Sequence, residues 1–340
     1  MKPVKTQRII RATRLCLTIL IAELIIRYFN INHSAWIPIT ITVVLFDQAT
    51  VGGILNRSFL RLCATISGIL IGLATLFVFK NNVTLNIVAT LIATFIYAYL
   101  FMDKKNSYIG ILGLVTLFMI LLSNDSINTS IYRSSNIIFG IIIAIVMSLI
   151  FFPQSAKKTT SQLLIASIEK IKITFELLLS ENQNNYKELE THFLNIESGL
   201  ISQLTQFSRY LDEAKFEGQA NKLQYYSTVL LSIRRIYRIL NVIYQTNSYA
   251  NLHNHKEIKL ILQNLYQVYS NLYDNLTVNK KELLHIDTTT FTKPDSITDK
   301  EEYDLIFIHK ILNHLIDETN HLTETLVLAH HCENNVKIRN

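Results

Sequence analysis

The sequence predicts an all-α protein in two parts, a six-helix transmembrane domain over residues 1–153 and a helical cytoplasmic domain over residues 154–340. Apolar residues make up 49% of the chain and charged residues only 17%, against about 25% charged in an ordinary soluble domain. The long apolar runs stop at Pro153, and an amphipathic pattern follows. Residues 1–158 carry 14 Lys and Arg against four acids, whereas the remainder is net acidic. The composition excludes an ordinary cytosolic enzyme and a disordered chain.

Six apolar runs account for the first part, at residues 15–29, 35–46, 62–79, 83–101, 108–123 and 132–152. A helix needs about 20 residues to cross the ~30 Å hydrocarbon core of a bilayer. The run at 35–46 reaches only about 18 Å at ~1.5 Å per residue. It therefore either continues into residues 47–55 or is a broken element that lines a wet cavity.

Lys and Arg near the ends of these runs predict the orientation. With the N-terminus inside, eleven of them fall on cytoplasmic segments, and only Arg27, Lys80 and Arg133 fall outside. Cytoplasmic loops of membrane proteins carry an excess of Lys and Arg. The bias predicts a multi-pass protein of the inner (cytoplasmic) membrane with both termini in the cytoplasm.

Small residues mark where helices approach closely. Gly68 and Gly72 are four residues apart on one helix face, and Gly140 with Ala144 repeats the spacing. Such pairs let two backbones come together. The partner helix lies either within the same chain or in a second copy, and both alternatives remain open.

Charged residues inside the runs are the candidate functional groups, because they are costly in a membrane. Glu23 and Arg27 are spaced to pair on one helix face, or Glu23 carries a proton. Arg57 and Arg61 share a face, either as anchors or as anion ligands. Arg133 opens the last run on the outer side, where the charge rule does not require it.

A polar stretch, Asp47 to Gly53, follows the short second run directly. Gly52-Gly53 allows backbone geometry that other residues avoid. A helix terminus here would direct its dipole at the same vestibule as the two arginines. Gln48 lies in this stretch, and Trp36, the only tryptophan, opens the second run at the opposite membrane surface.

These motifs resemble the fusaric acid resistance/aromatic acid exporter family and, more distantly, plant aluminium-activated malate channels. The resemblance rests on Trp36-Ile37-Pro38-Ile39-Thr40, Gly52-Gly53, Arg57-x-x-x-Arg61-x-x-Ala64-Thr65-x-x-Gly68, Arg133-x-x-Asn136-x-x-x-Gly140 and Arg209-Tyr210-Leu211-Asp212-Glu213-Ala214-x-x-Glu217. Ala64 departs from the pattern, where glycine is usual.

The resemblance implies a transporter that exports small organic anions, aromatic acids among them. Many such exporters carry two six-helix blocks, so the single block here implies a homodimer in the lipid bilayer. In this interpretation Arg57, Arg61 and Arg133 attract the carboxylate, and Trp36 and Gln48 add contacts. The alternative is a membrane-anchored helical scaffold or regulatory protein without transport activity.

The second part shows five amphipathic stripes, which predict a five-helix bundle. It contains no P-loop, dinucleotide-binding or hydrolase motif, so no enzyme and no cofactor are predicted. His314, Asp317 and His321 share a face, but their spacing matches no metal signature, so no metal is predicted. Arg234, Arg235 and Arg238 are interpreted as partners of nearby carboxylates, with a regulatory anion as the alternative and no nucleic acid, because this part is net acidic.

Overall fold

A computed structural model describes residues 4–79, 83–103, 107–122, 127–179, 186–218, 220–245, 256–278 and 303–337. Every regular element among these residues is a helix, which confirms the predicted all-α class. The chain divides into two compact units, Met1–Ala156 and Lys157–Asn340. The predicted domain boundary at Pro153 lies close to this division.

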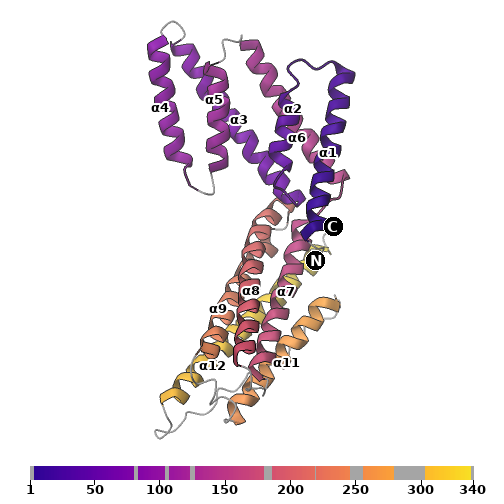
Figure 1. Cartoon of the computed structure of the whole chain (residues 1–340), viewed down its shortest axis with the longest axis vertical. Helices are drawn as coiled ribbons and strands as arrows, with labels where there is room; N and C mark the ends of the chain where they lie inside the picture. The colour runs from indigo at the N-terminus through magenta and orange to yellow at the C-terminus, as the bar shows by residue number, and fades with distance from the viewer. Residues whose placement is uncertain are drawn as a thin grey trace. The chain divides into compact units, whose positions relative to one another are not determined.

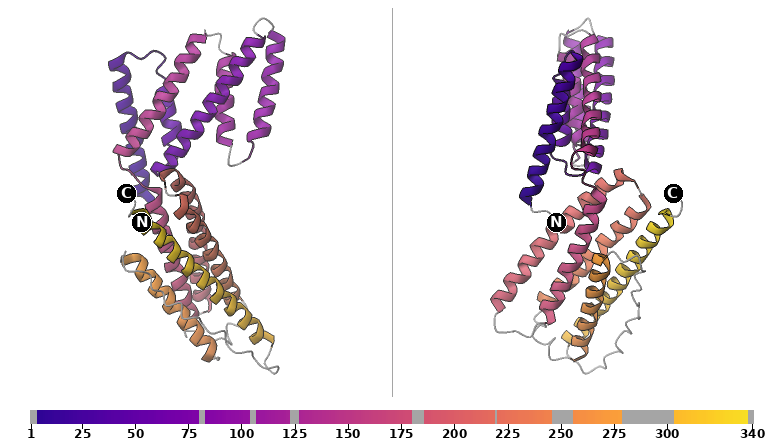
Figure 2. Two further views of the ribbon diagram at one scale, coloured as in Figure 1. Left: turned by 180° about the vertical axis from the view of Figure 1, so that it is seen from behind. Right: turned by 90° about the vertical axis from the view of Figure 1, so that its right-hand side faces the viewer.

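The first unit contains six of the described helices, which run alongside one another (Figures 1 and 2). They are α1 (Val4–Phe29), α2 (Trp36–Leu45), α3 (Val51–Phe79), α4 (Val83–Phe101), α5 (Ser107–Leu122) and α6 (Ile127–Ile150).

Helix α2 lies at the centre of the packed core of this unit. Its residues Ile37, Ile41 and Val44 are fully buried, in one cluster with Ala22 of α1 and Ala144 of α6. An apolar helix that is covered on several sides needs no polar face. The shortest helix of the unit is therefore the one most completely surrounded by the others.

The helix boundaries correct two of the predicted runs. Helix α2 ends at Leu45, so the second run is the broken element and does not continue into residues 47–55. Helix α3 begins at Val51 rather than at residue 62, because the Thr50 side chain accepts a hydrogen bond from Gly53 N at 3.0 Å and caps the helix start. Arg57 and Arg61 consequently lie within α3, not before it.

Two segments are long and apolar enough to cross a membrane by length and composition, Val51–Thr75 and Tyr132–Ile150. Shorter apolar helices are Trp36–Leu45, Ile87–Phe101 and Ser107–Leu121. Only 33% and 44% of the residues in the two long apolar windows are buried by the chain itself. Two such segments do not establish six spans, and the six-span topology stays a prediction.

The second unit contains five long helices among the described residues. They are α7 (Ala156–Leu179), α8 (Tyr186–Ala214), α9 (Ala220–Gln245), α11 (Lys256–Val278) and α12 (Tyr303–Lys337), and the short 3₁₀ turn η2 (Lys215–Glu217) follows α8. Helix α7 begins at the last residue of the first unit. The described side chains of their predicted stripes are buried or half-buried, and Phe175 of α7 stacks on Tyr269 of α11 at 5.3 Å between ring centroids.

The sequence motif at Arg209 to Glu217 has a structural role in this unit. Arg209 and Glu213 form an ion pair at 3.1 Å one turn apart on α8. Glu217 Oε2 accepts a hydrogen bond from the backbone N of Lys157 at 3.2 Å, at the start of α7. A carboxylate at a helix N-terminus satisfies an amide that lacks an intrahelical partner. The motif therefore fixes the first turn of α7.

Candidate functional site

The turn between α2 and α3 is the polar centre of the first unit. Gln48 N donates to Leu45 O at 3.2 Å, and Ile54 N donates to Thr50 O at 3.1 Å. Val51 N, at the first residue of α3, donates to Gln154 O at 2.9 Å. The chain therefore changes direction within a few residues, in a turn closed by its own hydrogen bonds and by the segment after α6.

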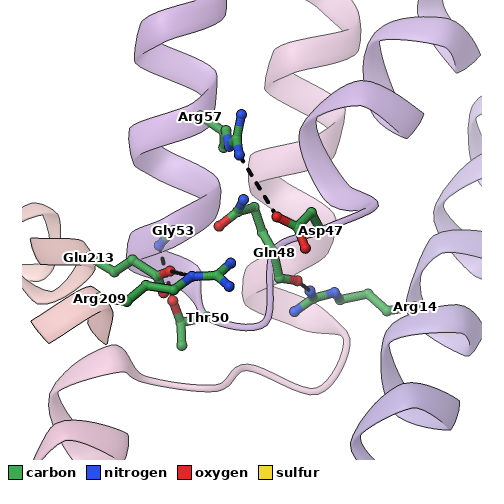
Figure 3. A network of polar contacts seen from close by, with 8 residues as sticks. All are labelled: Arg14, Asp47, Gln48, Thr50, Gly53, Arg57, Arg209 and Glu213. Atoms are coloured by element: carbon green, nitrogen blue, oxygen red, sulfur yellow. Dashed lines mark hydrogen bonds and ion pairs between the residues drawn. The ribbon is translucent and has the colours of Figure 1, made fainter. Parts of the chain in front are cut away.

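Arg14 of α1 holds this turn from the other side (Figure 3). It is only 1% exposed, and its guanidinium donates to Ala49 O at 3.3 Å and to Gln48 O. A cation next to carbonyls that follow a helix end also complements the negative end of the helix dipole. Arg14 is one of the eleven Lys and Arg that the charge count places on cytoplasmic segments, and the structure gives it this positioning role as well.

Arg57 of α3 lies on the same side as Asp47 of the turn (Figure 3), with 3.8 Å between the nearest nitrogen and oxygen. Their side chains are 31% and 64% exposed. The Arg57 guanidinium also lies over the ring of Tyr108, 4.4 Å from its centroid. A long, exposed ion pair contributes little, whereas the aromatic face orients the guanidinium. Arg57 therefore interacts weakly with the Asp47 carboxylate and is positioned mainly by the Tyr108 ring.

Arg61, one turn further along α3, is buried in a different way. It is 2% exposed, and its Nε has no hydrogen-bond partner among the described residues. The Ser58 hydroxyl is likewise buried without a partner in this part of the chain. The buried Tyr108 hydroxyl has no partner in good hydrogen-bond geometry among the described residues, and the donor that interacts with it is Arg57. Both arginines are close enough to Tyr108 to interact with it electrostatically.

Buried polar groups without partners are rare, because each costs about 1–3 kcal/mol in lost hydration. Here the Arg61 Nε and the Tyr108 hydroxyl belong to neighbouring side chains, and the Arg57 guanidinium lies beside them. We name Arg57, Arg61 and Tyr108 the arginine–tyrosine cluster. Its donors match the needs of a carboxylate, which accepts up to four hydrogen bonds and carries the opposite charge.

The structure does not bring Arg133 together with this cluster. Asn136 follows Arg133 by three residues on α6. Its side-chain nitrogen donates to the backbone oxygens of Asn32 and His33, each at 2.9 Å, in the loop between α1 and α2. Trp36 begins α2 after that loop. The arginine–tyrosine cluster is instead linked to the turn at the other end of α2, through the contact of Arg57 with Asp47. The predicted site residues therefore divide into two groups, one near each end of α2.

Glu23 and Arg27 do not form the pair that their spacing allows. Glu23 is half-buried on α1 and Arg27 is exposed, and no ion pair joins them within the described residues. Gln48 is 4% exposed, so it lies inside the turn. The proposed roles of Glu23, Gln48 and Trp36 are not tested by this geometry.

The glycines pack within the chain. A Cβ added at Gly68 would lie 2.7 Å from Gly113 O and 2.8 Å from Thr116 Cβ, both on α5. At Gly72 the nearest atoms belong to Ile120, also on α5, and at Gly140 the nearest is Ile37 O of α2. The Gly68–Gly72 face is therefore occupied by α5 and is not available for a second copy.

The same contacts position the cluster. Gly68 meets Gly113 and Thr116, and Gly72 meets Ile120, so α3 and α5 run in the same direction with their backbones close together. This register brings Tyr108, at the start of α5, alongside Arg57 and Arg61. Sequence reasoning missed Tyr108, because a tyrosine at the start of an apolar helix is typical of a membrane surface and gives no sign of its neighbours.

In the second unit, His321 Nδ1 lies 3.0 Å from Ser232 Oγ, so this histidine of the polar stripe contacts a neighbouring helix. No group of three or more His, Cys, Asp and Glu side chains that could hold a metal ion is found among the described residues. Arg235 pairs with Glu318 at 2.9 Å, as expected of that arginine group.

Comparison with known sequences bears directly on the first unit. Residues 18–147 match the family model described as fusaric acid resistance protein-like. The match confirms the resemblance over the C-terminal part of α1 and all of α2 to α5, and it ends within α6. The arginine–tyrosine cluster lies inside this fusaric acid resistance protein-like region.

The chain is also similar to the inner membrane protein YeeA of Escherichia coli strain K12. The two are 31% identical over 186 residues, which cover 54% of this chain and 52% of the relative. The chain thus spans about half the length of the curated relative that it matches.

Proposed function

We propose that the protein is an inner-membrane transporter that exports small organic anions, aromatic acids among them, and that it is not an enzyme. The observation that carries the proposal is the buried Arg61, whose Nε lacks a hydrogen-bond partner among the described residues and which lies near Tyr108. The match to the fusaric acid resistance protein-like family and the inner-membrane location named for the relative support it.

The exposed surface of the first unit supports a bilayer around it. On α4 the side chains of Leu91, Phe95 and Tyr99 are 64%, 72% and 79% exposed, and on α3 Phe77 is 92% exposed. Soluble proteins rarely expose contiguous apolar patches beyond a few hundred Å². In our proposal α1 to α6 are six spans, with the second unit and both termini in the cytoplasm, as the distribution of Lys and Arg predicts.

The arginine–tyrosine cluster is the proposed inner binding station. Arg61 binds the carboxylate through its planar fork, and the Tyr108 hydroxyl donates a further hydrogen bond. Arg57 can leave its weak contact with Asp47 and add a second positive charge. Gln48 lies in the adjoining turn and adds a polar contact.

Arg133 and Trp36 form a second, outer station in this proposal, since they belong to the other end of the unit. An anion released by Arg61 would next meet a positive charge and an aromatic ring before it leaves. Glu23, a half-buried acid on α1, is the proposed proton carrier. The transporter is proposed to be a homodimer, although the Gly68–Gly72 face is not its interface.

Transport by purified protein tests the proposal. Proteoliposomes loaded separately with benzoate, cinnamate, malate and a neutral control, benzyl alcohol, should release one or more of the acids faster than protein-free liposomes. Efflux of every acid at the protein-free rate would instead favour the membrane-anchored scaffold, which needs no conducting path.

A further inference from the structure

A cavity of about 350 Å³ lies in the second unit, between α9 and α12. The two helices pack side by side, joined by the Arg235–Glu318 pair and by the Ser232–His321 hydrogen bond. The size falls at the lower end of the ~300–1,000 Å³ that small-molecule sites occupy. The proposed transport function does not use this cavity.

The walls of the cavity are apolar. Ile239 and Val242 of α9 face Phe307 and Ile311 of α12 across it. Val242 and Phe307 are 42% and 47% exposed, so apolar surface is left uncovered by the chain. An apolar body of small size would remove this surface from water, which is favourable by about 25 cal/mol per Å².

Charged side chains complete the lining. Arg235, Arg238, His314 and Glu318 all border the cavity. The carboxylate of Glu318 already neutralises Arg235 at 2.9 Å. Arg238 is exposed and makes no ion pair within the described part of the chain, so its charge is the one that remains for a ligand.

We propose that this cavity binds an amphipathic organic monoanion, an aromatic or branched aliphatic monocarboxylate. Its apolar body fills the space between Ile239 and Ile311, and its carboxylate meets the Arg238 guanidinium. A dicarboxylate fits poorly, because its second charge would lie against apolar walls or beside Glu318. Polyphosphates are disfavoured for the same reason, since one available arginine cannot balance several negative charges.

Calorimetric titration of the full chain in nanodiscs with 2-naphthoate tests this inference. The titrations use an Arg61→Gln background, so that binding at the arginine–tyrosine cluster is weakened and failure of the transport proposal leaves this test intact. Arg238→Gln should weaken 2-naphthoate binding about 10-fold or more, the effect of losing one charge-assisted contact. Val242→Trp fills the space from an exposed position and should abolish saturable binding.

Arg234→Gln is the matched control, because Arg234 is the neighbouring arginine on α9 and does not line the cavity. It should bind 2-naphthoate with the affinity of the background protein, and succinate should not compete. Equal affinities in the Arg238→Gln, Val242→Trp and Arg234→Gln proteins would overturn the inference. So would the absence of saturable 2-naphthoate binding in the background protein.

Discussion

Replacing Tyr108 by Phe should make the protein more stable and a poorer transporter. The hydroxyl of Tyr108 is buried without a partner in good hydrogen-bond geometry among the described residues. Its removal relieves a desolvation penalty of about 1–3 kcal/mol. At about 2–4 °C per kcal/mol for a unit of this size, the melting temperature should rise by about 2–12 °C.

The same substitution removes a donor from the proposed anion site. A hydrogen bond to a charged group contributes about 1.5–3 kcal/mol, so affinity for benzoate should fall about 10- to 150-fold. The Phe ring still offers its face to Arg57, which lies 4.4 Å from the ring centroid, so the arginine should stay in place. Fluorescence of Trp36, the single tryptophan, reports unfolding of the first unit, and benzoate efflux from proteoliposomes reports transport.

Tyr97→Phe is the matched control. Tyr97 is 2% exposed on α4, and its hydroxyl is also without a partner in the described residues, but it lies against Gly113, away from the arginines. Its removal should raise the melting temperature and leave efflux unchanged. The reasoning is refuted if Tyr108→Phe lowers stability, or if both variants transport benzoate at the wild-type rate.

Three further predictions concern the fold. Gly68→Ala places a methyl group 2.7 Å from Gly113 O and should destabilise the first unit by about 1–3 kcal/mol, whereas Gly199→Ala, whose nearest neighbour is the movable end of Lys170, should be neutral in thermal unfolding. Asn136→Ala removes two hydrogen bonds to the α1–α2 loop and should cost about 1–3 kcal/mol; an unchanged melting temperature would contradict this. Burial raises the pKa of the Tyr269 phenol, so burial of the neutral phenol stabilises the fold below about pH 10, and this contribution is lost at higher pH. The alkaline pH at which helix circular dichroism is lost should therefore shift in Tyr269→Phe.

Periodicity predicted the second unit well, because an amphipathic helix shows its buried face in its own sequence. Leu164, Ile168 and Phe175 recur at the spacing of one helix face, and all three are buried on α7. Hydropathy was less successful for the first unit. It missed the start of α3, since the residues between Val51 and Arg61 are too polar to count as a membrane run although the helix is capped at Thr50.

The candidate site was only partly predictable. The spacing of Arg57 and Arg61 on one face follows from the helix period and needs no structure. The contribution of Tyr108 requires the register of α5 on α3, which no local pattern gives. The sequence also grouped Arg133 with the other two arginines by charge alone, whereas Asn136 attaches that end of α6 to the loop between α1 and α2.

The most direct test of the central claim is the initial rate of benzoate efflux from proteoliposomes that contain Arg61→Gln. The account predicts a fall in kcat/KM of about 10- to 150-fold, partial recovery in Arg61→Lys, which keeps the charge but not the planar fork, and no change in Arg27→Gln, an exposed arginine on α1. The amount of folded protein, measured by Trp36 fluorescence, should be equal in the wild type and in the three variants. Wild-type efflux in folded Arg61→Gln would contradict the account.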